Sequence, residues 1–259
     1  MALITLEFGS QVLNMGERLN IILPDNFNES DPVENNQKKF PVLYLLHGYL
    51  GNNSDWIRLS SIERYASDHH IAVVMPSAYN SYYTNGLNGL NYFDYIANEV
   101  PEIASRLLPL SKDPKYNYIA GLSMGGYGAM KIGLTYPERF SLVASLSGAL
   151  DIQFIYDMSM QDGARNAHFK SIFGENVDFT NSTNSLLYLA NKLDKNIPFI
   201  YVNCGNEDFL IESNKKFVKH LDSIKVPYLY ETYPGSHTWE YWDTHIQNII
   251  NQIDSIKLN

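Results

Sequence analysis

The chain has 259 residues, of which 45% are hydrophobic and 18% are charged, and its formal net charge is −9. Lysine and arginine are nowhere clustered, so the chain lacks the basic patch that a nucleic-acid-binding surface needs. No apolar run approaches the roughly 20 residues that cross a bilayer, so we expect no membrane partner. The length and the hydrophobic content predict a single domain over residues 1–259.

The cellular location is predicted from the N-terminus and the cysteine content. Residues 1–7 have neither the basic stretch nor the long apolar core of a secretory signal. Cys204 is the one cysteine of the chain, which excludes an internal disulfide and suits a reducing compartment. We therefore expect a cytoplasmic protein.

Predicted strands and helices alternate along the chain. Strands are predicted at 2–23, where an antiparallel pair turns near Asn14, and at 41–46, 71–76, 116–120, 141–147, 197–204 and 228–233. Helices are predicted at 54–67, 92–108, 126–134 and 210–224, and a last helix presents Trp239, Trp242, Ile246, Ile249, Ile250 and Ile253 on one face. This alternation predicts an α/β fold with a mainly parallel central sheet and helices on both faces.

Three segments interrupt the alternation. Residues 25–39 are rich in Asn, Glu and Pro, which predicts a surface loop. Pro101 is expected to kink or break the helix at 92–108. Residues 150–195 lack strand periodicity but carry scattered aromatic and methionine side chains, which predicts a small helical insertion over the sheet.

Gly121-Leu122-Ser123-Met124-Gly125 stands between a predicted strand and a glycine-rich helix. A serine at the centre of such a turn is held in a strained backbone conformation with its hydroxyl above the sheet, and residues two positions to either side must be small. Gly121 and Gly125 meet this requirement. Ser123 is therefore a candidate nucleophile, and the alternative is a serine that only caps the helix.

Two further strand ends supply partners for Ser123. The strand at 197–204 runs into an acidic loop that contains Asp208, and the strand at 228–233 ends just before His237. The carboxyl ends of parallel strands meet at one edge of a sheet, and the chain order serine, acid, histidine is that of α/β-hydrolases. A serine hydroxyl needs a base to become nucleophilic. We therefore expect His237 to accept its proton and Asp208 to orient and stabilise the imidazole.

The negatively charged oxygen of a tetrahedral intermediate requires hydrogen-bond donors. The expected donors are the amide of Met124, at the start of the elbow helix, and the amide of Tyr49, in the loop His47-Gly48-Tyr49-Leu50-Gly51. Leu50 replaces Tyr49 if the loop turns one residue later. His47 opens this loop and is expected to hold it by hydrogen bonds rather than to act as the base.

Other titratable residues fit these roles less well. His69, His70 and His168 lack a strand-end setting, and His220 and His245 lie within predicted helices. Glu207 and Asp151 are the alternatives to Asp208 as the acid. No ligand spacing predicts a metal site, and the glycine-rich stretch at 121–128 matches neither a phosphate loop nor a dinucleotide fingerprint, so we expect neither a metal nor a cofactor.

Aromatic and methionine residues gather in the segment after the strand at 71–76 and in the insertion at 150–195. They are Tyr79, Tyr82, Tyr83, Tyr92, Phe93, Phe154, Tyr156, Met158, Met160, Phe169 and Phe173. Such side chains are expected to form an apolar acyl or aromatic pocket, with the insertion as a partly mobile lid over the active site. For each residue taken singly, ordinary core packing is the simpler expectation.

Four segments together resemble the esterase D-like family of esterases. They are Leu45-Leu46-His47-Gly48-Tyr49-Leu50-Gly51-Asn52 followed by Trp56, Gly121-Leu122-Ser123-Met124-Gly125-Gly126, Cys204-Gly205-Asn206-Glu207-Asp208-Phe209, and Gly235-Ser236-His237-Thr238-Trp239 with Trp242. The family includes bacterial tributyrin esterases, feruloyl esterases, S-formylglutathione hydrolases and mycolyl transferases. The chain is most similar to the tributyrin esterases through its compact size, its His-Gly loop and the absence of an export signal.

The resemblance implies an α/β-hydrolase fold with Ser123, Asp208 and His237 as the catalytic triad and Tyr49 and Met124 as the oxyanion donors. S-formylglutathione hydrolases usually carry a Ser-Gly-Leu-Thr-Cys type of loop where this chain has the segment from His47 to Gly51, which disfavours thioesters. Mycolyl transferases are exported, and the signal for export is missing.

The sequence as a whole predicts a serine carboxylesterase that acts on small soluble acyl esters through an acyl-enzyme intermediate. Hydroxycinnamate esters of the feruloyl type are the alternative substrates, and thioester hydrolysis is a second alternative. A catalytically inactive binding module on the same fold is the alternative from a different class. Such a module would have no reason to keep the serine, the acid, the histidine and the oxyanion loop together. Relatives form homo-oligomers, but nothing in the sequence locates an interface.

Overall fold

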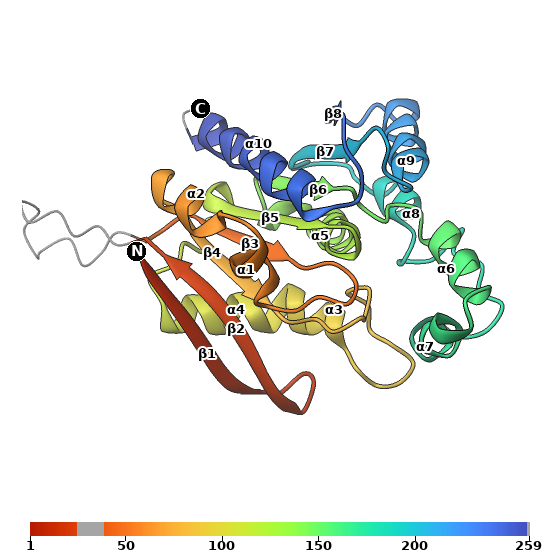
Figure 1. Cartoon of the computed structure of the whole chain (residues 1–259), viewed down its shortest axis with the longest axis horizontal. Coiled ribbons are helices and arrows are strands. Elements are labelled where there is room, and N and C mark those ends of the chain that lie inside the picture. The colour runs from red at the N-terminus through yellow and green to blue at the C-terminus, as the bar shows by residue number, and fades with distance from the viewer. Residues whose placement is uncertain (25–38, 258–259) are drawn as a thin grey trace, which may run out of the picture.

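Eight strands form one sheet in the computed structural model, which describes residues 1–24 and 39–257 (Figure 1). The strands are β1 (Ala2–Ser10), β2 (Met15–Leu23), β3 (Val42–Leu46), β4 (Ala72–Pro76), β5 (Asn117–Leu122), β6 (Leu142–Leu146), β7 (Phe199–Gly205) and β8 (Leu229–Tyr233). Their order across the sheet is β1-β2-β4-β3-β5-β6-β7-β8. The predicted loop at 25–39 falls almost entirely outside the described residues.

The sheet is antiparallel only at its N-terminal edge. β1 and β2 pair from Ala2 opposite Leu23 to Ser10 opposite Met15, and β2 runs antiparallel to β4. All other neighbouring strands are parallel. The mainly parallel α/β fold predicted from the alternation of elements is therefore confirmed.

Helices cover both faces of this sheet. They are α1 (Asp55–Leu59), α2 (Ile62–Asp68), α3 (Tyr92–Asp94), α4 (Val100–Leu107), α5 (Met124–Thr135), α6 (Ile152–Met160), α7 (Gly163–Phe173), α8 (Leu186–Ala190), α9 (Ile211–Ser223) and α10 (Trp239–Lys257). Short 3₁₀ turns at Pro114–Tyr116 and Pro137–Arg139 precede β5 and β6.

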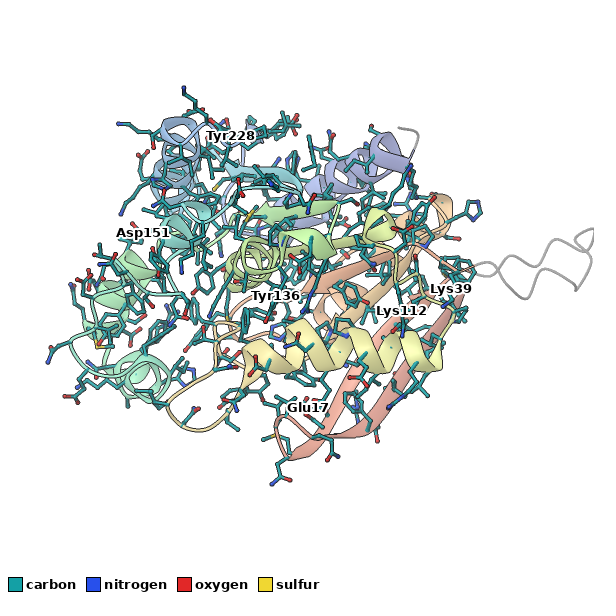
Figure 2. The ribbon with its side chains drawn as sticks, turned by 180° about the vertical axis from the view of Figure 1, so that it is seen from behind. Glu17, Lys39, Lys112, Tyr136, Asp151 and Tyr228 are labelled. Carbon is teal, nitrogen blue, oxygen red and sulfur yellow. The ribbon has the colours of Figure 1, made fainter. Side chains whose placement is uncertain are left out.

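Side chains that alternate along the strands divide the core into two layers. In β3, Tyr44 and Leu46 belong to the layer beneath α4, α5 and the helices of 150–195, whereas Leu43 and Leu45 face α1, α2 and α10. All five residues of β3 are buried, as expected for a central parallel strand that is covered on both faces. The reverse view shows α4 lying across the face of the sheet beside β1 and β2 (Figure 2).

Two predicted helices are interrupted. The helix expected at 54–67 is divided into α1 and α2 between Leu59 and Ile62. The helix expected at 92–108 contains a π-helical turn, Tyr95–Glu99, immediately before α4. Pro101 cannot donate to the carbonyl of Ala97, which instead accepts a hydrogen bond from Arg139 Nη1 at 3.2 Å. The segment is therefore helical from Tyr92 to Leu107 without a break, and the irregularity expected at Pro101 takes the form of the π-helical turn just before it.

The segment at 150–195 is mostly helical, as its lack of strand periodicity predicts. Each of its three helices begins with a side-chain cap: Asp151 accepts from Phe154 N, Asp162 from Ala164 N, and Ser185 from Tyr188 N. α6 and α7 lie on the side of the sheet where the parallel strands end (Figure 1). Within residues 1–24 and 39–257, no helix has the length and hydropathy needed to span a membrane.

Candidate active site

Ser123 lies at a sharp turn between β5 and α5, with φ 53° and ψ −116°. A Cβ at Gly121 would come within 2.4 Å of Gly125 backbone atoms, and a Cβ at Gly125 would lie 2.5 Å from the carbonyl oxygen of Leu46. Real Cβ atoms essentially never come this close to backbone atoms, so both positions require glycine. The strained turn is the nucleophile elbow that the spacing of the two glycines predicts.

His237 lies between Ser123 and Asp208. Its Nε2 is 3.0 Å from Ser123 Oγ, and its Nδ1 is 2.8 Å from Asp208 Oδ2. The amide of Leu210 donates to Asp208 Oδ1 at 2.9 Å. Burial of Asp208 acts to raise the pKa of this carboxyl, but the hydrogen bond and charge of His237 and the Leu210 amide outweigh it and hold the pKa below its usual range. The acid is therefore ionised near neutral pH.

The loops after β7 and β8 approach each other closely enough to bring the acid to the histidine. A Cβ at Gly205 would lie 2.2 Å from the carbonyl oxygen of Gly235. Glu207 N donates to this same carbonyl at 3.1 Å, which ties the two loops together. The imidazole of His237 also packs against two rings, since its centroid is 4.8 Å from those of Phe209 and Trp242.

Hydrogen bonding distinguishes the two donors expected from the oxyanion loop, the amides of Tyr49 and Leu50. Leu50 N donates to Asn80 Oδ1 at 2.7 Å, so this amide is already paired. The amides of Tyr49 and Met124 donate to no protein acceptor among residues 1–24 and 39–257. The geometry favours Tyr49 over Leu50, because an oxyanion donor must be free to bind substrate.

His47 is neutral and fixed in one tautomer. Its Nδ1 lies 2.7 Å from the carbonyl oxygen of Gly48, and its Nε2 accepts a hydrogen bond from Ala78 N at 2.9 Å. Burial lowers the pKa of His47 to about 4, although the Gly48 carbonyl partly opposes this. Tyr83 Oη donates to the carbonyl of His47 at 2.9 Å, so His47 braces the loop that carries Tyr49.

The alternative acids have other partners. Asp151 caps α6 and pairs with Lys216. Glu207 accepts a hydrogen bond from Gly235 N and so contributes to the loop that carries His237. Of the three acids weighed from the sequence, Asp208 is the one placed against the imidazole.

Comparison with known proteins identifies the family of the chain. The family described as "Putative esterase" matches residues 10–253. The chain belongs to this family. An acetyl esterase of Caldicellulosiruptor saccharolyticus is 31% identical to this esterase, and the match covers 99% of each chain.

Solved structures resemble the esterase over nearly its whole length. The fluorophosphonate-binding serine hydrolase FphF of Staphylococcus aureus is 36% identical, with a TM-score of 0.88 over 97% of this chain and 98% of that one. The S-formylglutathione hydrolase FrmB of the same organism is 36% identical, with a TM-score of 0.85 over the same shares. A ferulic acid esterase is 25% identical, with a TM-score of 0.80 and 98% of each chain covered. The chain is thus an α/β-hydrolase and a carboxylesterase.

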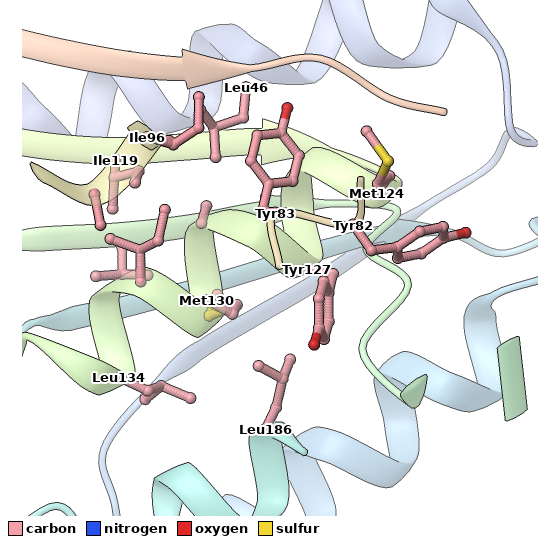
Figure 3. Close-up of a cluster of buried hydrophobic side chains, with 14 of the residues drawn as sticks. Leu46, Tyr82, Tyr83, Ile96, Ile119, Met124, Tyr127, Met130, Leu134 and Leu186 are labelled. Carbon is pink, nitrogen blue, oxygen red and sulfur yellow. The ribbon is translucent and has the colours of Figure 1, made fainter. Parts of the chain in front are cut away.

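The esterase has a cavity of about 690 Å³ above Ser123. It is lined by Gly48, Tyr49, Leu50, Asp55, Leu59, Tyr82, Leu122, Ser123, Ala149, Ile155, Met158, Arg165, Phe209, Leu210, His237, Thr238, Trp239, Glu240 and Trp242. Of the aromatic and methionine residues expected in a pocket, only Tyr82 and Met158 line this one. Tyr83, Tyr92, Tyr156, Phe169 and Phe173 are packed in the core, as Figure 3 shows for Tyr83.

Several lining residues were not predicted from the sequence. Phe209, Trp239 and Trp242 stand within the acid and histidine motifs, so their spacing was a signal that could have identified them. Ile155 and Arg165 come from α6 and α7, where no motif marks them. Within the described residues, no group of three or more His, Cys, Asp or Glu is arranged to hold a metal ion.

Proposed function

We propose that this carboxylesterase hydrolyses small, soluble, short-chain acyl esters of the tributyrin type through an acyl-enzyme intermediate. The observation that carries the proposal is the continuous line of contacts from Asp208 through His237 to Ser123, at 2.8 and 3.0 Å. Ser123 is the nucleophile, His237 the general base and acid, and Asp208 the group that orients the imidazole.

In the acylation step, Ser123 Oγ attacks the ester carbonyl carbon while its proton moves to His237 Nε2. Asp208 stabilises the imidazolium that forms and stays ionised itself. The tetrahedral intermediate then collapses, the carbon–oxygen bond to the alcohol breaks, and the alcohol leaves with the proton from His237. The acyl group remains on Ser123.

Deacylation repeats these steps with water. His237 Nε2 takes a proton from the water as its oxygen attacks the acyl carbon, and a second tetrahedral intermediate forms. The bond to Ser123 Oγ breaks, and the serine recovers its proton from His237. In both intermediates the amides of Tyr49 and Met124 donate to the negatively charged oxygen, the role that their free N–H groups support.

The acyl length is proposed from the relatives and the cavity walls. The curated relative at 31% identity is an acetyl esterase. The large rings of Tyr82, Trp239 and Trp242 line the cavity together with Ser123 and His237, and we infer that they limit the acyl chain to a short one.

Two alternatives have support of their own. The rings of Tyr49, Tyr82 and Trp239 would also stack against a hydroxycinnamate, and a ferulic acid esterase shares the fold at 25% identity. Thioester hydrolysis is supported by the likeness to an S-formylglutathione hydrolase at 36% identity. The short-chain esterase, the hydroxycinnamate esterase and the thioesterase differ in the substrate that should give the highest kcat/KM.

The test is a kcat/KM panel with acetyl, butyryl, octanoyl and feruloyl esters and S-formylglutathione, with Ser123→Ala as the control. We expect acetyl or butyryl esters to exceed the others by at least about tenfold, a difference that an apolar pocket which excludes longer acyl chains can supply. A higher value for the feruloyl ester or for the thioester would replace the proposal with that alternative. Ester hydrolysis that persists in Ser123→Ala would contradict the role of Ser123.

Three further properties expected from the sequence remain predictions. They are a cytoplasmic location, a single domain over residues 1–259 in which 150–195 is the lid, and assembly into a homo-oligomer. Fractionation, limited proteolysis and sedimentation would test them in turn.

A further inference from the structure

Arg165 on α7 is the one arginine or lysine among the residues that line the cavity above Ser123. The proposed reaction does not use it. The cavity is also lined by the carboxylates Asp55 and Glu240, which adjoin Trp56 and Trp239. Asp55 belongs to α1 and Glu240 to α10, and these two helices are in contact at the cavity, since the rings of Trp56 and Trp239 are 5.2 Å apart. Arg165 lines the cavity from α7 of the insertion.

The guanidinium of Arg165 has donors to spare. Its nearest acidic partner is Asp162, with Nε 3.5 Å from Oδ2, and Asp162 is about half exposed. The other oxygen of Asp162 accepts from the amides of Ala164 and Arg165 and so caps α7. A guanidinium has five N–H donors, and those of Arg165 form no hydrogen bond with a protein acceptor in the part of the chain that the structure describes.

Two tyrosine rings lie beside this guanidinium. Arg165 lies over the ring of Tyr49, 5.0 Å from its centroid, and the rings of Tyr49 and Tyr82 are 5.9 Å apart. Burial raises the pKa of both phenols, and the charge of Arg165 only partly opposes it, so both remain protonated donors. Neither hydroxyl is hydrogen-bonded to a protein group among residues 1–24 and 39–257, and both residues line the cavity.

We propose that Arg165, Tyr49 and Tyr82 form a subsite for a carboxylate, so that the preferred substrates are esters that carry a free carboxylate besides the ester group. The inference rests on the proposed esterase function and narrows its substrate class. A planar carboxylate matches the fork of a guanidinium, and two O–H donors complete its hydrogen bonds. Asp55 and Glu240 repel an anion from the α1 and α10 side, which orients such a substrate.

Matched ester pairs test the subsite in each half of the substrate. In the acyl half, the 4-nitrophenyl monoester of glutaric acid is compared with 4-nitrophenyl pentanoate. In the alcohol half, 4-acetoxybenzoate is compared with its methyl ester. The measured quantity is the ratio of kcat/KM for the anionic ester to that for its neutral partner.

In wild type we expect this ratio to exceed one for at least one pair and to fall at least about tenfold in Arg165→Met, mainly through KM. Arg165→Lys keeps the positive charge but loses the forked pair of donors, so its ratio should lie between those of wild type and Arg165→Met. Arg64→Met is the matched control, because Arg64 also lies over a tyrosine ring, 4.9 Å from the centroid of Tyr65, but is exposed and does not line the cavity. Its ratio should equal that of wild type.

One result would overturn the subsite: a ratio that Arg165→Met leaves unchanged in both pairs. If kcat/KM falls by the same factor for the neutral and the anionic esters, the ratio is unchanged, and Arg165 then only anchors α7 on Tyr49. Failure of the proposed esterase function is distinguishable, because wild type would then hydrolyse neither the anionic nor the neutral esters.

Discussion

Lys131 Nζ donates a hydrogen bond to the carbonyl oxygen of Tyr83, at 3.3 Å, and so joins the elbow helix to the loop behind the oxyanion segment. Its other two donors reach Thr84 Oγ1 at 2.7 Å and Asn184 Oδ1 at 2.6 Å. Tyr83 in turn donates to the carbonyl of His47. A single buried side chain on α5 therefore connects the helix that follows Ser123 to the loop that carries Tyr49.

The first prediction concerns the charge of Lys131. Burial lowers the pKa of Lys131 to about 7, and Asp94 opposes this only in part. Between that value and its ordinary pKa, the unfolded chain binds a proton that the folded protein lacks, so this group makes the protein more stable as the pH rises. The free energy of unfolding should gain up to about 1.4 kcal/mol per pH unit from this group above pH 7.

Urea unfolding of wild type and Lys131→Met at pH 7.5, 8.2 and 9 measures this contribution, because the difference between the two proteins removes the titration of other groups. The stability of wild type relative to Lys131→Met should rise with pH. Lys112→Met, which alters an exposed lysine, should show no such trend. A difference that is flat with pH would mean that Lys131 titrates normally in the folded protein.

A second prediction distinguishes Asp208 from its neighbour in the sequence. In Asp208→Asn the amide donates to His237 Nδ1, which places the ring proton on Nε2, where it cannot accept from Ser123. We expect kcat for 4-nitrophenyl acetate to fall by about 10³–10⁴-fold. Glu207→Gln keeps the triad contacts, and its kcat should fall by less than about tenfold. A fall as large as that of Asp208→Asn would mean that the assignment of Asp208 as the acid is wrong.

The third prediction concerns His47. His47→Ala removes the donor to the Gly48 carbonyl and the acceptor for Ala78 N, so the Tyr49 amide loses its fixed position. Removal of a whole oxyanion donor costs about 10²–10³-fold in kcat, and we expect a loss of about tenfold or more with a smaller change in KM. His70→Ala, at an exposed position, is the control and should retain full activity. Unchanged kcat in His47→Ala would show that the loop holds its shape without this side chain.

A fourth prediction concerns the elbow. In Gly125→Ala the new Cβ would lie 2.5 Å from Leu46 O and 2.6 Å from His47 O, and these backbone atoms at the end of β3 and the start of the oxyanion loop cannot move aside without displacing that loop. We expect a loss of about 1–3 kcal/mol of stability together with most of the activity. Gly163→Ala adds a Cβ with nothing within 4 Å and should leave the stability unchanged or raise it. Urea unfolding and kcat/KM of both variants provide the comparison, and equal behaviour would refute the steric argument.

The sequence by itself determined the element order, the parallel sheet and the three loops that carry Ser123, Asp208 and His237. These features depend on local periodicity and on the rule that the strands of a parallel sheet end at one edge. An irregularity in the helix near Pro101 also followed from one residue, because a missing N–H acts locally. The place of the π-helical turn, Tyr95–Glu99, did not follow from the sequence, because Arg139, which donates a hydrogen bond to the freed carbonyl of Ala97, is distant along the chain.

Only the tertiary structure decided which groups of similar chemistry take which role. Tyr49 is favoured over Leu50 because Asn80, 30 residues away, already occupies the Leu50 amide. Likewise, Asp208 rather than Asp151 meets His237 because Gly205 lets two loops touch. The cavity position of Arg165 and the burial of Lys131 have no sequence signal at all. Both depend on contacts between residues that are far apart in the chain, and such contacts produce no periodicity or motif in the sequence.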